Sequence, residues 1–269
     1  MIYIAILLGL LGLALGSFVN AFVWRLKTKR DWVSGRSECV HCHHTLAASD
    51  LIPVVSWVFL RGKCRYCKKP ISVQYPLVEL ATGLLFVASY LWWPISLNSG
   101  FAIADFVLWL LSLVILMSLF LYDLKWYTLP DKLTYPLMLI GLVQGILRVV
   151  WIAPGAAHPA GLLELVYGLL PIAGLYAFLF FVSKGRWVGL GDAKLGVFIG
   201  LVLGWQGALL VLVLANFMGV LVVLPGLLMQ KIGRNSKVPF GPFLIIAFIV
   251  AALFGGWLID WYVANNFII

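Results

Sequence analysis

Long apolar runs alternate with short polar stretches along most of this 269-residue chain. A helix needs about 20 predominantly apolar residues to cross a bilayer, and runs near this length recur through the sequence. The pattern predicts eight membrane spans, of which the sixth is short for a full crossing. The expected ranges are Ile2–Trp24, Leu77–Trp93, Ala102–Tyr122, Leu133–Val150, Leu162–Val182, Ala193–Leu203, Gln206–Met229 and Phe243–Val263.

The only long polar insertion, residues 25–76, separates the first two predicted spans. We therefore expect a first transmembrane helix at 1–24, a cytoplasmic loop at 25–76 and a transmembrane core at 77–269. Composition supports this division, because 63% of residues are hydrophobic and only 11% are charged, against about 45–50% and about 25% in soluble domains. The predicted fold class is an all-α integral membrane protein with about eight transmembrane helices.

The positions of the charges orient the predicted spans. A net charge of +9 could suggest nucleic acid, but the basic residues cluster beside apolar runs, so we expect a lipid bilayer and no nucleic-acid partner. With the N-terminus outside, 18 of the 19 lysines and arginines fall on the cytoplasmic side, and Arg148 lies towards the outside. This is the positive-inside pattern. The N-terminal segment lacks a basic region and a small-residue cleavage site, so we expect no cleavable signal peptide.

All four cysteines lie in the predicted cytoplasmic loop, as two Cys-x-x-Cys pairs separated by 21 residues. Such pairs are typical of a closed zinc site with four thiolate ligands. Disulfides and free thiols are the alternatives, of which the reducing cytoplasm disfavours disulfides. We predict a structural, non-catalytic zinc, because four thiolates leave no open coordination position. Histidine can also bind zinc, but we expect His41, His43 and His44 to lie at the surface. The predicted ligands are Cys39, Cys42, Cys64 and Cys67.

Two aspartates stand at the cytoplasmic edges of separate predicted spans. Asp123 ends the third span, and Asp192 begins the sixth. Ionisable residues at membrane depth are costly and usually face the bundle interior or a polar cavity. Two carboxyl groups that meet share one proton, which lets one act as a base on water while the other polarises a carbonyl. We therefore predict that Asp123 and Asp192 are catalytic, and that the helix dipole favours the anion at Asp192 but not at Asp123.

The stretch "GLGDAK" around Asp192 carries further candidate residues. Gly189 and Gly191 would allow close approach of an extended peptide substrate. Lys194 is interpreted as a positive-inside anchor, with a catalytic role left open. The alternative for Asp192 is a helix cap without chemistry.

Three other carboxylates are assigned structural or solvated positions. Asp131 fits the first turn of the fourth span. We expect Asp50, in the loop, to be solvated, and Asp105 to be hydrated near an outer end.

The cysteine and aspartate motifs, taken together, resemble those of a known family. "DLKWYTLPDKLT", followed by "GLGDAKL" with the second aspartate 69 residues after the first, is similar to the prepilin peptidases, or type IV leader peptidases, which are membrane aspartic proteases of the G-x-G-D type. "LGSFVNAFVWRL", "SECVHC" and "DLIPVVSWVFLRGKCRYCKKPISVQYPLVELATG" precede these motifs in family order. His43 departs from the family pattern, which commonly has glycine there.

The resemblance implies an activity and a location. It places the catalytic pair on Asp123 and Asp192, which would cut the leader from type IV prepilins or pseudopilins. The enzyme would lie in the bacterial inner membrane with its active site facing the cytoplasm. Members with a cysteine-bearing loop typically also methylate the new N-terminal amine with S-adenosylmethionine. No fingerprint locates that cofactor's site, although Asn20, Arg25 and Glu79 could line it or anchor span ends instead.

Other functions stay open on the sequence alone. The chain could be a peptidase only, with a zinc loop that is structural or docks substrate. It could be a transporter that relays protons or binds a cation through its membrane carboxylates, or a membrane scaffold without chemistry. The particular pilin and the oligomeric state are not predicted.

Overall fold

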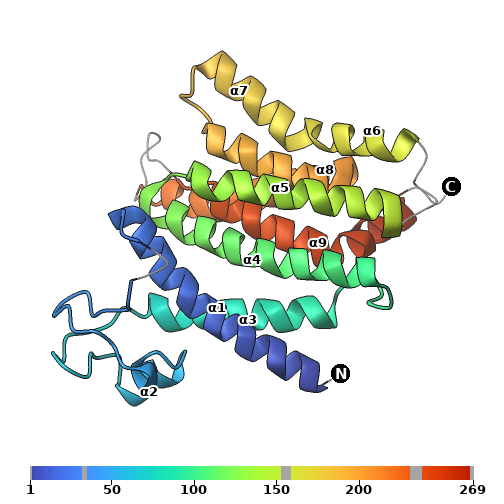
Figure 1. The fold of residues 1–269 in the computed structure, drawn as a ribbon. Helices are drawn as coiled ribbons and strands as arrows, with labels where there is room; N and C mark the ends of the chain where they lie inside the picture. The colour runs from blue at the N-terminus through green and yellow to red at the C-terminus, as the bar shows by residue number, and fades with distance from the viewer. Residues whose placement is uncertain (1, 32–34, 153–158, 231–237, 267–269) are drawn as a thin grey trace. The chain divides into compact units, whose positions relative to one another are not determined.

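The computed structural model describes residues 2–31, 35–152, 159–230 and 238–266 (Figure 1). Within these ranges the regular structure is helical, apart from two isolated bridges that pair Glu38 with Thr45 and Lys63 with Pro70. Six helices in these ranges are long and apolar enough to cross a membrane. The predicted all-α membrane class is therefore confirmed. Of the basic residues that oriented the spans, Lys231, Arg234 and Lys237 lie outside the described residues.

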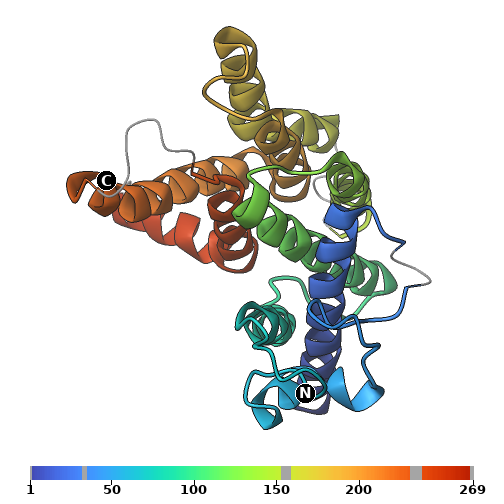
Figure 2. The same ribbon diagram turned by 90° about the vertical axis from the view of Figure 1, so that its left-hand side faces the viewer.

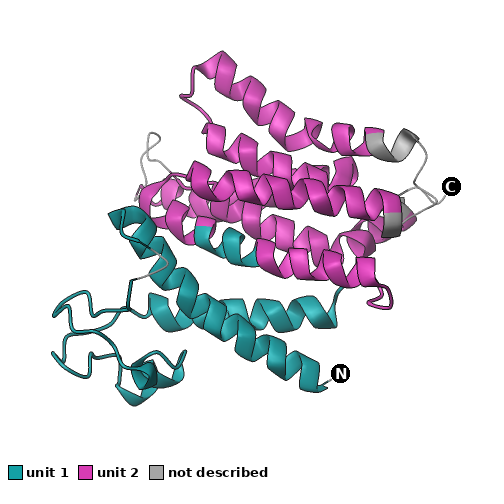
Figure 3. Cartoon of the chain, in the orientation of Figure 1, with its two compact units in different colours: residues 1–93, 113–118 teal, residues 94–112, 119–269 magenta. Residues whose placement is uncertain are grey.

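The chain divides into two compact units, which Figure 3 colours separately. Unit 1 comprises residues 1–93 and 113–118, and unit 2 comprises residues 94–112 and 119–269. The functional division at residues 24 and 76 stays a prediction.

In unit 1 the helices α1 (Ile2–Thr28) and α3 (Gln74–Leu91) pack closely in opposite directions. A Cβ atom added at Gly12 would lie 2.8 Å from the Gly83 Cα, and one at Gly16 would lie 2.7 Å from the Glu79 Cα. Small residues at such positions let membrane helices approach backbone to backbone. The Asn20 amide strengthens the pair by donating to the Tyr75 carbonyl at 3.1 Å.

The loop between these helices contains the short 3₁₀ turn η1 (Ala48–Asp50) and the short helix α2 (Val55–Phe59). The prediction of a solvated Asp50 was wrong, because its side chain is only 3% exposed. The carboxylate accepts hydrogen bonds from Arg65 Nε at 2.6 Å and from the Tyr66 hydroxyl at 3.1 Å. Burial raises the pKa of Asp50, but these donors, led by Arg65, outweigh it and leave the pKa below its usual value. The sequence did not reveal these partners, which lie fifteen and sixteen residues further along the chain.

Unit 2 contains the remaining helices. Its elements are α4 (Gly100–Trp126, which also passes through residues 113–118 of unit 1), α5 (Asp131–Leu147), η2 (Arg148–Ile152), α6 (Pro159–Gly168), η4 (Leu170–Gly174), α7 (Leu175–Ser183), α8 (Leu190–Leu228) and α9 (Gly241–Asn266).

The predicted sixth and seventh spans both fall within α8, which is broken at Gly204. Gly204 has φ 67° and ψ −174°, a backbone conformation that only glycine adopts readily. Phe198, before the break, packs on Phe248 with ring centroids 5.0 Å apart. After the break, a Cβ atom on Gly255 would contact Leu210. Further along this second half, Gly219 lies beside Phe240 and Phe243, so the second half runs antiparallel to α9. The first half runs parallel to α9, because Gly191 and Gly241, at the two helix starts, both contact Leu129. This break, together with α3, which is not among the six apolar helices, accounts for the difference between six and eight spans.

A buried ion pair joins α4, α5 and α8. The prediction of a hydrated Asp105 was wrong, because its side chain is fully buried. Arg148 Nε binds both Asp105 carboxylate oxygens, at 3.2 and 3.1 Å, and Gln144 donates at 3.1 Å. Arg148 Nη1 also donates to the Val202 carbonyl at 2.9 Å, just before the break in α8. A carboxylate can be buried here because a neighbouring element supplies its counter-charge.

Candidate active site and cysteine cluster

Four helix ends meet at one end of unit 2, which faces the viewer in Figure 2. Tyr127, in the left-handed conformation with φ 55°, ends α4 and turns the chain towards α5. Leu129 in this connection reaches the first turns of two later helices. A Cβ atom added at Gly191 would lie 2.9 Å from the Leu129 Cβ, and one added at Gly241 would lie 3.5 Å from the Leu129 Cδ2. The starts of α8 and α9 are therefore packed against the α4–α5 connection.

Asp123 lies in the last turn of α4 and is only 5% exposed. Its Oδ2 accepts a hydrogen bond of 3.1 Å from the backbone N–H of Gly241, the first residue of α9. A Cβ atom at position 241 would lie 2.7 Å from the same oxygen. Only glycine therefore leaves room for the carboxylate in this position.

Asp192 is half-buried in the first turn of α8. Its carboxylate accepts a hydrogen bond from the backbone N–H of Gly189, the residue before the helix, as in the acidic half of a capping box. The alternative that Asp192 caps a helix therefore has a structural basis. The same carboxylate also interacts electrostatically with Asp123. Unit 2 thus brings the two predicted catalytic aspartates to one end, although no hydrogen bond joins them in the described structure.

Helix dipoles do not distinguish the two aspartates in the structure, contrary to the prediction, because each carboxylate faces the start of a helix. In the structure Asp123 accepts the first N–H of α9, so it also faces the end of a helix that favours an anion. Tertiary packing therefore supplies Asp123 with the environment that the sequence assigned to Asp192 alone.

Sequence reasoning missed two residues at this end, Gly241 and Tyr176. The Gly-Pro pair at the start of the last apolar run could have drawn attention to Gly241, whereas no sequence feature marks Tyr176. Tyr176 is 5% exposed, and its ring meets Phe240 edge to face at 5.9 Å. Its phenol interacts electrostatically with Asp192 and is hydrogen-bonded to Asn216. Tyr176, with Asn216 beside it, thus lies near Asp192.

The other residues of "GLGDAK" make contacts within the chain. Lys194 Nζ binds the Asp131 carboxylate and lies 4.7 Å from the Tyr135 ring centroid, which ties α8 to α5. The space beside Gly191 is filled by Leu129, whereas a Cβ atom at Gly189 would meet only ordinary contacts. The proposed part of both glycines in substrate binding stays a prediction.

The four cysteines converge as their spacing predicts. The four Sγ atoms all lie within 4.8 Å of one another, and those of Cys39 and Cys67 are 3.9 Å apart. Tetrahedral zinc with bonds of about 2.3 Å requires sulfur atoms about 3.8 Å apart. The donor set therefore fits this metal. His41, His43 and His44 are exposed, as predicted, and are not part of the cluster.

The two Cys-x-x-Cys segments share one backbone pattern. The N–H of His43 donates to the Cys39 carbonyl at 2.9 Å, and the N–H of Lys68 donates to the Cys64 carbonyl at 3.0 Å. Both donors have left-handed backbones, with φ 56° at His43 and 60° at Lys68. This conformation explains why glycine suits position 43, where the sequence departs from the family.

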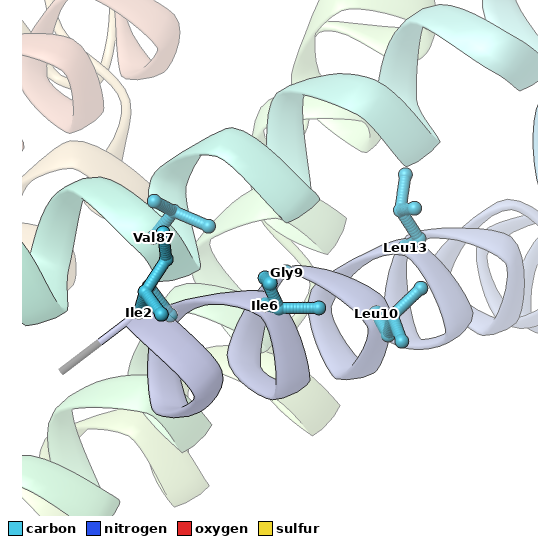
Figure 4. A pocket seen from close by; sticks show the side chains of 7 residues that line it. Ile2, Ile6, Gly9, Leu10, Leu13 and Val87 are labelled. Carbon is cyan, nitrogen blue, oxygen red and sulfur yellow. The ribbon is translucent and has the colours of Figure 1, made fainter.

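The polar residues considered for the methyl-donor site hold unit 1 together. Glu79 is buried and accepts the Val54 N–H at 2.7 Å, while Asn20 also accepts a hydrogen bond from Gln74 at 3.2 Å. Arg25 lies in the last turn of α1. A groove of about 310 Å³ between α1 and α3, lined by Ile2, Ile6, Leu10 and other apolar groups, offers no catalytic side chain (Figure 4).

Two protein-family models match the chain, one over each half of its motifs. Residues 10–93 match the bacterial peptidase A24 N-terminal domain, and residues 110–224 match the type IV leader peptidase family. No solved structure matches the chain.

Curated relatives extend the match over nearly the whole chain. An Aeromonas hydrophila protein named prepilin leader peptidase/N-methyltransferase is 33% identical over 95% of this chain and 92% of its own length. Proteins of the same name from Stutzerimonas stutzeri (34% identical; 91% and 89% covered) and Legionella pneumophila (30%; 97% and 95%) are also similar. This multi-pass membrane protein therefore belongs to the type IV leader peptidase family, with relatives named as bacterial prepilin leader peptidase/N-methyltransferases.

Proposed function

We propose that this chain cleaves the leader from type IV prepilins or pseudopilins at the cytoplasmic face of the bacterial inner membrane. One observation carries the proposal: Asp123 binds the first N–H of α9, and the starts of α8 and α9 both pack against Leu129, so Asp123 and Asp192 lie at one end of unit 2. The names of the relatives supply the substrate class.

The chemistry follows from two carboxyl groups that share one proton. The ionised carboxylate takes a proton from water as the water oxygen bonds to the scissile carbonyl carbon, and the protonated carboxyl group donates its proton to the carbonyl oxygen. The resulting diol collapses when the C–N bond breaks. The leaving nitrogen takes the proton that the base had accepted, and one diol hydroxyl returns a proton to the other carboxylate as the product carboxyl group forms, which restores the pair. Gly241 holds one Asp123 oxygen in place during these steps.

The test is cleavage of a purified prepilin by the Asp123→Asn and Asp192→Asn variants. Each substitution keeps the side-chain shape but removes the ionisable group, so we expect cleavage to fall by at least about 1,000-fold. Asp131→Asn is the matched control, because Asp131 lies at the same end with a 57% exposed side chain. Near-normal cleavage by either catalytic variant would exclude the mechanism.

We propose that the same chain then methylates the new N-terminal amine with S-adenosylmethionine, as the second half of its relatives' names indicates. The amine nitrogen would bond to the donor's methyl carbon as the carbon–sulfur bond breaks, and the nitrogen would lose a proton. A peptidase without this activity is the alternative. Transfer of labelled methyl groups to a pre-cleaved pilin peptide separates the two, since only the bifunctional enzyme labels it.

Cys39, Cys42, Cys64 and Cys67 would hold a structural zinc in this function. The metal would supply folding free energy to a loop that has little core of its own. We expect one zinc per chain by elemental analysis. Cys39→Ser should lose the metal while the helices of unit 2 remain folded.

A further inference from the structure

The segment Leu51–Leu60 is unlike the rest of the predicted polar loop. It reads "LIPVVSWVFL", in which only Ser56 is polar. An apolar run of about this length is typical of a buried core helix or of an interfacial segment. Burial is excluded by the exposed fractions of the large side chains. These are 40% for Leu51, 49% for Ile52, 45% for Val55, 59% for Val58 and 83% for Phe59.

The segment lies beside the apolar part of a membrane helix. The Val54 N–H, at the start of α2, binds the Glu79 carboxylate at 2.7 Å, and the Glu79 Cα packs against Gly16 of α1. The apolar run of α1 ends at Trp24. Gly16 lies eight residues before this end, or about 12 Å at 1.5 Å per residue. α2 therefore begins at a depth along α1 that belongs to the candidate span (Figure 1).

The local backbone fixes which side chains are left uncovered. Val54 has φ 62°, a costly conformation for a β-branched residue, and its hydrogen bond to Glu79 holds it there. The Trp57 indole turns towards the loop, donating to the Ile71 carbonyl at 3.1 Å and packing over Gly62. Val55, Val58 and Phe59 remain exposed to the surroundings.

Basic residues follow the apolar segment directly. Arg61, Lys63, Lys68 and Lys69 are all exposed. Two nearby carboxylates are already paired, Glu38 with Arg30 and Asp50 with Arg65. An apolar stretch bordered by unneutralised positive charge fits a bilayer surface that carries anionic lipid headgroups.

We propose that residues 51–63, which we call the interfacial segment, lie in the cytoplasmic-leaflet interface of the bilayer. The apolar side chains enter the acyl-chain region, and Arg61 and Lys63 contact anionic headgroups. The segment thereby tethers the polar loop to the membrane surface on the side of the second cysteine pair, which begins one residue further along the chain. This inference concerns lipid contact and does not depend on either proposed catalytic activity.

The test is photo-crosslinking in the full-length protein, reconstituted in vesicles of phosphatidylethanolamine and phosphatidylglycerol. p-Benzoylphenylalanine replaces Phe59 or, in a second variant, Val58. Leu84, 67% exposed on α3, is the lipid-facing control, and Val40, 46% exposed in the first cysteine pair, is the control outside the segment. After illumination we expect the intact mass of the Phe59 and Val58 variants to rise by one phospholipid, in yields like that of Leu84 and well above that of Val40.

Two results would overturn the inference. The first is a lipid adduct at Phe59 and Val58 no more abundant than at Val40. The second is an adduct to protein, either a second copy of this chain or an added prepilin, in place of lipid. The adducts should also contain more phosphatidylglycerol than its share of the vesicles, and an unbiased lipid mixture would contradict the contact with anionic headgroups.

Discussion

Asp123 owes its position to a backbone group that lies 118 residues further along the chain. The N–H of Gly241 binds its Oδ2 at 3.1 Å, and no side chain larger than hydrogen fits at position 241 without moving that oxygen. Gly241 is therefore a positioning residue for the proposed reaction, acting through Asp123.

Gly241→Ala should impair cleavage without unfolding the protein. The added Cβ would displace the Asp123 carboxylate, and misplacement by about 1 Å can cost about 100-fold in rate. We expect kcat for prepilin cleavage to fall by about 10- to 100-fold with little change in KM. Gly256→Ala in the same helix is the control, because its Cβ would meet no atom within 4 Å. Equal activity of the two variants would contradict the assigned role.

Lys194 should be dispensable for cleavage. Its ammonium group is bound to Asp131, the two side chains being 18% and 57% exposed, and ion pairs that solvent reaches contribute only about 0–1 kcal/mol. Lys194→Met should therefore retain kcat within about five-fold, like Asp131→Asn. If Lys194→Met abolished cleavage while Asp131→Asn did not, the lysine would have a catalytic role.

At the scale of elements, the two cysteine turns show how a local conformation restricts sequence. His43→Gly should stabilise the loop, because a left-handed backbone costs a non-glycine residue about 1–2 kcal/mol. Part of that gain is offset by the greater freedom of glycine in the unfolded chain, about 0.5–1 kcal/mol. We expect a net gain of about 0.5–1 kcal/mol, measured as tighter zinc retention against a chelator. His44→Gly should give no gain, since His44 lacks the positive φ and stacks on Tyr66 at 3.7 Å.

The ion pair between Asp105 and Arg148 holds three helices together, so removing one partner should be costly. Arg148→Met leaves a fully buried carboxylate without its counter-charge, which typically costs about 3–5 kcal/mol. We expect a clearly lower thermal unfolding temperature in detergent. Adding Asp105→Asn to this variant should recover part of the loss, because the neutral amide removes the buried charge. A single variant as stable as the parent would show that solvent reaches the site.

The sequence predicted elements better than it predicted partners. Apolar run lengths and cysteine spacing are local signals, and they located the helices, the break before Gln206 and the four thiols. Asp50 and Asp105 were misplaced because their counter-charges, Arg65 and Arg148, come from elsewhere in the chain. Gly241 was missed for the same reason. The interfacial segment was overlooked because the charged residues around it made the whole loop look polar.

At the scale of the whole molecule, the charge pattern predicts one orientation for the fold. The helix ends that carry Asp123, Asp192 and Gly241 meet in unit 2, and the positive-inside rule predicts that those ends face the cytoplasm. The reversal at Gly204 is required for this agreement. Without it, α8 would be a single helix of 39 residues, about twice the length that a bilayer requires.

The reversal predicts which positions an impermeant thiol reagent can reach in intact cells. Trp205, 45% exposed beside the break, should lie outside, and Trp187, 71% exposed between α7 and α8, should lie inside. We therefore expect a charged maleimide to label Trp205→Cys in intact cells, but to label Trp187→Cys only after the membrane is opened. Peptide-level mass spectrometry distinguishes these sites from the four native cysteines, which should also be protected in intact cells. Labelling of Trp187→Cys alone would invert the topology and put the aspartates on the outer face. Equal labelling of both in intact cells would mean that α8 does not re-cross the bilayer.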